Sequence, residues 1–369
     1  MFTLIEHGEV YAPEPRGAQS VLLAGEQIVK IGAVDGAKLA ALDLPCELVD
    51  ATGCLVTPGL IDPHEHLIGA GGEEGFSSRT TEVPLTQLLK NGITTAVGCL
   101  GTDTTTRHLS SLLGKVRQLE ADGLTAYMYT GGFQVPPPTL TGSVMDDLVL
   151  IDKIIGVGEI AISDTRSVAP TLDELARFVS LTLLGGMVGG KAGVVHFHVG
   201  PGKARLSLLN DLLDKHEIAP QTLYPTHCNR TLPLLDDAIA FAKRDAYVDI
   251  DTTEENLADG LRYYRDHGGP LDRLTVSSDA HAIGNTLKLY EQFAASVRDH
   301  KLALDWVLPL FTRNTAAILK LAAKGELREQ KDADVLVMRK DSFDLVHVFA
   351  RGRHLLKDGQ VVVQSENES

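Results

Sequence analysis

Eight apolar, strand-like runs recur through the middle of the chain, from about residue 57 to about residue 322, and segments with helical patterns separate them. The runs are "GCLVTPGLID", "GITTAVGCLG", "LTAYMYTGG", "IGVGEIAIS", "GVVHFHVG", "TLYPTHCN", "AYVDIDTT" and "RLTVSSDA". In the helical segment "PTLDELARFVSLTLL", Thr171 and Glu174 have the spacing of a capping box. Eight strand–helix units in about 260 residues predict a (β/α)8 barrel. An open doubly wound sheet is the alternative, but nothing here resembles its GxGxxG phosphate-binding turn.

The two ends of the chain have a different pattern. Residues 1–56 contain "SVLLAGEQIVKIG", in which two β-rich runs flank "AGEQ", and residues 323–369 contain "ADVLVMRK" and "LVHVFARGRHLLKDGQVVV". Short strands separated by turn sequences predict hairpins. We therefore expect residues 1–56 and 323–369 to pair into one small β-sandwich domain beside a barrel domain over residues 57–322.

Charge and cysteine content exclude several classes of partner. The formal net charge is -15, so no basic surface is expected for a nucleic acid or an anionic membrane. The 4 cysteines have no CxxC spacing, which favours reduced, mostly buried thiols. The N-terminus has no basic stretch followed by an apolar one, and no apolar run is long enough to span a bilayer. These features predict a soluble, cytoplasmic protein.

Polar residues stand at the carboxyl ends of five of the eight predicted strands, and these ends converge on one mouth of a barrel. They are His64 and His66 on the first strand, Glu159 on the fourth, His198 on the fifth, His227 on the sixth and Asp279 on the eighth. His64 and His66 are two residues apart, so they share one face of their strand. Imidazoles and carboxylates without thiolates favour zinc, or another divalent transition metal, at a catalytic site. Two metals that share a bridging carboxylate would use all six residues.

Seven stretches carry a resemblance to a known family. They are "PGLIDPHEHLIGAGGEEG", "GITTAVGCLGTDTTTRH", "TGGFQVPPPTLTGSV", "AISDTRS", "GGKAGVVHFHVG", "PTHCNR" and "LTVSSD". Through them the chain resembles the amidohydrolase superfamily and, within it, the isoaspartyl (β-aspartyl) dipeptidases, over nearly its whole length. The later stretch "GELREQKDADVLVM" is similar to that superfamily's return to its β-sandwich.

The resemblance implies a role for each metal-binding residue. His64 and His66 would hold the more buried metal, and His198 and His227 would hold the second. Asp279 would bind the first metal and also act as the catalytic proton shuttle.

The resemblance also implies four substrate-binding residues. Glu73 in "GGEEG" would receive the free α-ammonium group of the substrate. Arg166 in "SDTRS" and Arg230 in "CNR" would hold substrate carboxylate, which suits a planar bidentate donor. Thr102 in "LGTD" would form a hydrogen bond to the substrate, and the glycines of "GAGG" would let the backbone approach it closely.

Three positions depart from the family's pattern. Glu159 stands where the family has a carboxylated lysine; because glutamate is shorter, the strand end must approach the metals, and Gly158 would permit this by forming a bulge. Phe133 replaces a tyrosine that polarises the scissile carbonyl, so another donor such as Gln134 or Tyr129 must act. Ile283 replaces a serine in "AHAIGNT", where His281 and Asn285 are the candidate substitutes.

Together these observations predict a metal-dependent hydrolase of C–N bonds. Zinc, two ions per subunit bridged by Glu159, would lower the pKa of a bound water and so supply a hydroxide nucleophile; a single-metal site is the alternative. The predicted substrate is a β-aspartyl dipeptide, and the resemblance implies a homo-oligomer. Rival predictions are a hydrolase of N-acyl amino acids, a cyclic-amide hydrolase of the dihydroorotase or hydantoinase type, and a scaffold without catalysis.

Overall fold

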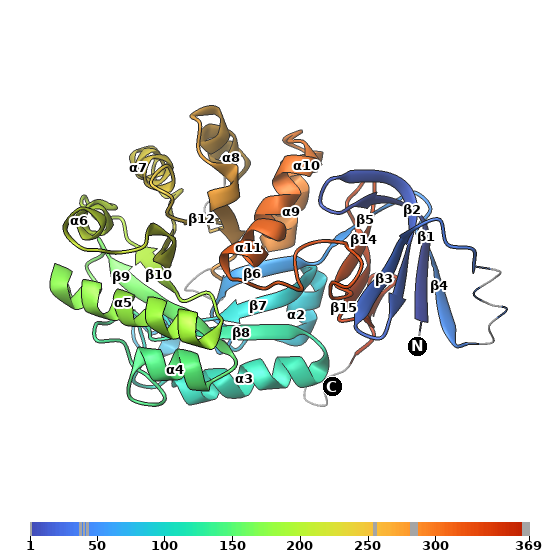
Figure 1. Ribbon diagram of the computed structural model, residues 1–369. Coiled ribbons are helices and arrows are strands. Elements are labelled where there is room, and N and C mark those ends of the chain that lie inside the picture. The colour runs from blue at the N-terminus through green and yellow to red at the C-terminus, as the bar shows by residue number, and fades with distance from the viewer. Residues whose placement is uncertain are drawn as a thin grey trace.

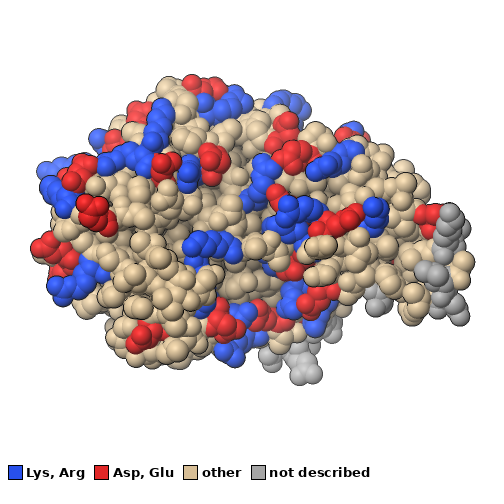
Figure 2. Space-filling model, in the orientation of Figure 1, with Lys and Arg blue, Asp and Glu red and all other residues tan. Residues whose placement is uncertain are grey.

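The computed structural model describes residues 2–36, 39, 41, 44–253, 257–280 and 287–363. It shows a mixed α/β protein in which parallel strands and their helices lie beside a large sheet built from both ends of the chain (Figure 1). No helix in these ranges is long and apolar enough to cross a membrane. Basic and acidic side chains are interspersed over the face shown in Figure 2, with uncharged areas between them.

Eight parallel strands follow one another through the middle of the chain. Six form one sheet in chain order: β6 (Leu60–Glu65), β7 (Ile93–Gly98), β8 (Thr125–Thr130), β9 (Ile154–Ile162), β10 (Val194–Val199) and β11 (Leu223–Thr226). The other two, β12 (Val248–Asp251) and β13 (Leu274–Ser277), pair with each other. Every residue of these strands except the half-buried Tyr127 is buried, which is typical of parallel sheets covered on both faces.

Backbone hydrogen bonds join the β12–β13 pair to both edges of the six-stranded sheet. On one side, Tyr247 N donates to Leu223 O over 3.2 Å, next to β12 and β11. On the other side, Asp279 N donates to His64 O over 3.1 Å, at the carboxyl ends of β13 and β6. The β12–β13 pair therefore lies between β11 and β6, the two edge strands of the six-stranded sheet.

Helices connect the strands and pack against them. They are α2 (Leu85–Lys90), α3 (Leu109–Asp122), α4 (Val144–Leu150), α5 (Leu172–Gly189), α6 (Ser207–Lys215), α7 (Leu232–Ala242), α8 (Leu257–Asp266), α9 (Leu289–Arg298), α10 (Leu304–Val307) and α11 (Arg313–Ile318), with 3-10 turns at Phe76–Ser78, Pro220–Thr222, Leu271–Arg273 and Leu308–Phe311. The predicted capping box is present, because Thr171 and Glu174 bond reciprocally at the start of α5. That helix ends at Gly189 and is capped by Gly190, whose φ of 65° is favourable for glycine.

Strands from both ends of the chain form one nine-stranded sheet. The amino-terminal strands are β1 (Phe2–Tyr11), β2 (Pro15–Ala24), β3 (Gln27–Gly32), β4 (Cys46–Asp50) and β5 (Cys54–Pro58); the carboxyl-terminal strands are β14 (Val335–Arg339), β15 (Leu345–Ala350), β16 (Arg353–Lys357) and β17 (Gln360–Val361). The antiparallel β5–β14 pair joins the two sets. The predicted hairpins at "AGEQ" and "KDGQ" are confirmed as β2–β3 and β16–β17. The two ends therefore pair as expected, but in a single hydrogen-bonded sheet, and a two-layered sandwich stays a prediction.

Candidate metal centre

The six residues predicted from the strand ends converge on one buried cluster. Their exposed fractions are His64 0%, His66 3%, Glu159 1%, His198 4%, His227 0% and Asp279 6%. His64 and His198 lie in β6 and β10, Glu159 lies in β9, and the other three follow the ends of β6, β11 and β13. Convergence follows from the parallel order of the strands, which brings their carboxyl ends to one side.

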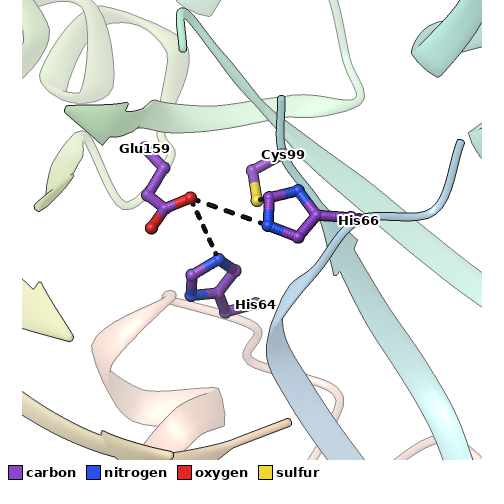
Figure 3. A group of neighbouring side chains, drawn as sticks. All are labelled: His64, His66, Cys99 and Glu159. Atoms are coloured by element: carbon purple, nitrogen blue, oxygen red, sulfur yellow. Dashed lines mark hydrogen bonds and ion pairs between the residues drawn. The ribbon is translucent and has the colours of Figure 1, made fainter. Parts of the chain in front are cut away.

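Glu159 stands between two pairs of histidines. Its Oε1 lies 2.6 Å from Nδ1 of His198 and 3.3 Å from Nε2 of His227. Its Oε2 lies 3.4 Å from Nε2 of His64 and 3.7 Å from Nε2 of His66 (Figure 3). Each oxygen of the carboxylate therefore faces one pair of imidazoles, the arrangement expected of a group that bridges two cations.

Asp279 completes one half of the cluster. Its Oδ1 lies 3.1 Å from Nε2 of His66 and 3.4 Å from Nε2 of His64. Asp279 and His227 both have left-handed backbone, with φ of 49° and 62°. Such a conformation is costly for a residue with a Cβ, and residues of this kind gather at functional sites.

A bulge in β9 brings Glu159 into position. The pairing of β9 with β10 shifts between Val195 and Phe197, so that Gly158 and Glu159 together face His196. A Cβ on Gly158 would lie 2.8 Å from Cβ of His196, which is too close for any other residue. The bulge predicted from the extra glycine is therefore present, and glycine is needed for the approach of the two strands.

Two observations show that the cluster fits divalent metal. Within the described part of the chain, the buried atoms Nε2 of His64 and Oε2 of Glu159 form no hydrogen bond. Buried polar atoms that form no hydrogen bond are costly, so these two, which face each other at 3.4 Å, indicate an ion that completes the site. In addition, candidate ligand atoms fall into two groups, one with His64, His66, Cys99 and Glu159 and one with Glu159, His198 and His227, in which all atoms lie within 4.8 Å.

The electrostatics of the cluster favour positive charge, which protonated imidazoles supply. Burial lowers the pKa of both His64 and His66, but Cys99 and the facing carboxylates raise it well above its ordinary value. Burial raises the pKa of Glu159, but the charges of His64 and His198 hold it well below its ordinary value. Positive charge on the imidazoles thus balances the carboxylates, and a bound divalent ion would take the place of those protons.

Each histidine also has an outer partner that the sequence analysis did not identify. His64 Nδ1 lies 3.1 Å from Nε2 of His196, and His66 Nδ1 lies 3.7 Å from Sγ of Cys99. His198 Nε2 lies 3.1 Å from Oδ2 of Asp164, and His227 Nδ1 lies 2.6 Å from Oδ2 of Asp251. Partners of this kind fix the tautomer and orientation of a ligand imidazole. Asp251 could have been found from the sequence, because it is a carboxylate at the end of the predicted strand "AYVDIDTT". The residues around Cys99 do not distinguish it from a thiol that only packs in the core.

Three of the four predicted substrate residues meet beside the cluster. Thr102 Oγ1 donates to Glu73 Oε1 over 2.8 Å, and Arg166 Nη1 lies 3.5 Å from the same oxygen. Arg230 lies apart from them and donates to Val199 O at the end of β10 over 3.0 Å. Burial and the charge of Arg230 lower the pKa of His227, but Asp251 and Glu159 outweigh them and raise it above its ordinary value, so Arg230 acts on the second histidine pair.

The glycine-rich loop after His66 has a structural explanation. Gly69 and Gly71 have φ of 75° and 78°, and a Cβ on Gly71 would lie 2.3 Å from the carbonyl oxygen of Ser78. These two glycines are therefore required by the packing of the loop against residues 78–81, not by substrate alone.

Phe133 takes part in packing around the cluster. Its ring centroid lies 4.6 Å from that of His198 and 5.1 Å from Cζ of Arg166. Of the two donors considered in its place, Tyr129 is 0% exposed and stacks on His196 inside the protein, so its hydroxyl cannot meet a substrate at the mouth. Gln134 is exposed and donates to Thr104 Oγ1. The altered loop with His281, Ile283 and Asn285 lies outside the described residues.

No family model matches the chain. The imidazolonepropionase of Fusobacterium nucleatum subsp. nucleatum is 36% identical over 91 residues, which are 24% of this chain and 21% of that protein. The chain therefore aligns with only about a fifth of this curated relative.

Solved structures match over the full length. The β-aspartyl dipeptidase of the thermophilic, keratin-degrading Fervidobacterium islandicum AW-1 is 41% identical and superimposes with a TM-score of 0.93, covering 100% of both chains. A structure of that enzyme in complex with the dipeptide β-Asp-Leu gives the same TM-score at 39% identity and 100% coverage of both chains. The D-hydantoinase of Thermus sp. has a TM-score of 0.67 at 17% identity over 98% of this chain and 97% of its own, and so shares the fold. The full-length match at this identity and the buried cluster at the strand ends together show that the chain belongs to the amidohydrolase superfamily and, within it, to the β-aspartyl dipeptidase family.

Proposed function

We propose that this protein is a metal-dependent hydrolase that cleaves the isopeptide bond of β-aspartyl dipeptides. The observation that carries the proposal is the position of Glu159, whose two oxygens each face a separate pair of buried imidazoles. The relative of known structure that binds β-Asp-Leu supports the choice of substrate.

The proposed cofactor is two zinc ions. His64, His66 and Asp279 would hold one ion, His198 and His227 would hold the other, and Glu159 would bridge them. Zinc in such a site lowers the pKa of water toward neutrality and polarises a carbonyl group.

Asp279 is the proposed acid–base residue. Its Oδ1 lies within 3.4 Å of two imidazoles and the residue is 6% exposed, so it would have access both to the cluster and to the mouth. There it would take a proton from the attacking water and deliver it to the departing amine, because a C–N bond breaks readily only when the nitrogen leaves as a neutral amine.

The substrate would be held by charges of both signs. The Glu73 carboxylate, with Thr102 beside it, fits an α-ammonium group, and Arg166, 3.5 Å away, fits a carboxylate. Arg230 adds a second cation near the histidines of the second pair. Opposite charges this close favour a zwitterion, and holding its ends would orient the isopeptide bond at the cluster.

The experiment that tests the proposal compares three substrates with zinc added. We expect hydrolysis of β-Asp-Leu, and a large loss of kcat/KM for its N-acetyl derivative, which has no ammonium group for Glu73. A hydantoin should be inert. Preference for the acetylated compound or for the hydantoin would instead assign the site to one of the rival hydrolases, and full activity without any metal would refute the proposal.

We also infer the finer organisation of the chain. The eight strands β6 to β13 would form a closed (β/α)8 barrel domain over residues 57–322, and this inference is supported by the hydrogen bonds that join β12 and β13 to both edges of the sheet. Residues 1–56 and 323–369 would form the second domain.

A further inference from the structure

Asp164 follows β9 and lies between the histidine cluster and the proposed substrate residues. Its side chain is 4% exposed. Oδ2 lies 3.1 Å from Nε2 of His198. The same carboxylate accepts two hydrogen bonds from the guanidinium of Arg166, 3.0 Å from Nε to Oδ1 and 2.8 Å from Nη2 to Oδ2. One buried carboxylate therefore contacts a proposed metal ligand and a proposed substrate ligand at once.

These contacts form a continuous chain of polar groups. His198 lies between two carboxylates, with Nδ1 2.6 Å from Glu159 and Nε2 facing Asp164. Arg166 continues the chain, because Nη1 lies 3.5 Å from Oε1 of Glu73. This series of contacts thus runs from the centre of the cluster to Glu73, the group proposed to receive the substrate's ammonium.

We propose that Asp164 is a positioning residue that orients His198 toward metal and Arg166 toward substrate, so that the two proposed binding functions depend on one side chain. The inference rests on the proposed function for the identity of the ligands. Asp164 touches neither metal nor reacting atoms, so its effect would pass through the two side chains that it holds.

Two physical arguments support this role. Nε2 of His198 has two neighbours, Oδ2 of Asp164 at 3.1 Å and Nη2 of Arg166 at 3.0 Å, and only the carboxylate can accept a hydrogen bond from it. If Nδ1 holds a metal through its lone pair, Nε2 must carry the proton, and Asp164 stabilises that tautomer. A carboxylate that occupies Nε and Nη2 of Arg166 fixes the plane of the guanidinium and leaves Nη1 for another anion.

Asp251 provides a matched control. It is also buried and holds a histidine of the same pair, with Oδ2 2.6 Å from Nδ1 of His227. Its Oδ1 accepts hydrogen bonds from the backbone N and Oγ1 of Thr253, and its backbone N donates to Oδ1 of Asn229. No arginine contact to Asp251 is present among the described residues. Replacing Asp251 should therefore disturb a metal ligand without disturbing Arg166.

The experiment compares Asp164→Asn with Asp251→Asn in the full-length protein. Zinc dissociation constants are measured by competition with a chromophoric chelator, and KM for β-Asp-Leu is measured at saturating zinc. We expect both variants to bind one zinc ion about 10–100-fold more weakly, as is usual when the outer partner of a ligand histidine is lost. Only Asp164→Asn should also raise KM, by about 10-fold or more, because the guanidinium loses its charged partner.

Two results would overturn the inference. The first is wild-type zinc affinity in Asp164→Asn, and the second is a KM that rises no more than in Asp251→Asn. The zinc titration needs no turnover, so failure to hydrolyse β-Asp-Leu would refute the proposed substrate while the titration still decides whether Asp164 supports His198.

Circular dichroism of the metal-free proteins checks folding. If Asp164→Asn does not fold, Asp164→Glu serves instead: it keeps the charge but displaces it by one methylene, so we expect a smaller loss of zinc affinity and a smaller rise in KM. Wild-type zinc affinity together with wild-type KM in Asp164→Glu would equally overturn the role of Asp164.

Discussion

Replacing Glu159 by glutamine tests the bridging role most directly. In the wild-type protein the two carboxylate oxygens face the two imidazole pairs at 2.6–3.7 Å. Glutamine keeps the shape of the side chain but has no charge and only one oxygen. Unit charges 4 Å apart at an effective dielectric constant of about 20 interact with about 4 kcal/mol. Because about 1.4 kcal/mol corresponds to tenfold in a dissociation constant, at least one zinc ion should bind about 10³-fold more weakly.

The assay is zinc stoichiometry by elemental analysis after dialysis against buffered free zinc, with circular dichroism as the check on folding. We expect at most one tightly bound ion in Glu159→Gln and a corresponding loss of hydrolysis. Glu73→Gln is the control, since Glu73 contacts Thr102 and Arg166 and no histidine of the cluster in the described chain; it should keep the wild-type stoichiometry. If Glu159→Gln held two zinc ions at wild-type affinity, Glu159 would not be a bridging ligand, and the positions of its two oxygens would not indicate one.

Three further outcomes are expected. Asp279→Asn should keep at least one metal yet lose nearly all turnover of β-Asp-Leu, and undiminished turnover would contradict its acid–base role. Zinc affinity should fall as pH is lowered, because the raised pKa values of His64 and His66 mean that protons compete with the metal at both imidazoles; a pH-independent dissociation constant measured by calorimetry would contradict this. Burial raises the pKa of Asp249 to about 7 despite its hydroxyl donors, so its protonated form favours the folded state and stability should decrease as pH rises from about 4 to about 7. Asp249→Asn should remove this slope and stabilise the protein at pH 8 by up to about 4 kcal/mol in urea denaturation, with no gain below about pH 4.

Local sequence patterns were sufficient to predict the strands of the central body and the six residues at their carboxyl ends. Strand runs, the capping box at Thr171 and the hairpin turns all depend on neighbours within a few positions. The shared face of His64 and His66 follows from the two-residue period of a strand. Once the strands are parallel and in chain order, their ends must meet on one side, so convergence of the cluster needed no knowledge of packing.

The tertiary structure alone decided how the cluster is divided and supported. Glu159 places one oxygen toward each histidine pair because the bulge at Gly158 shifts β9 against β10, and that register depends on contacts between two strands. The outer partners Asp164 and Cys99 come from other strand ends, at 3.1 and 3.7 Å from their histidines. Such distances are set by the arrangement of whole strands and helices. The sequence around a histidine does not show whether its second ring nitrogen will contact a carboxylate, a thiol or another ring.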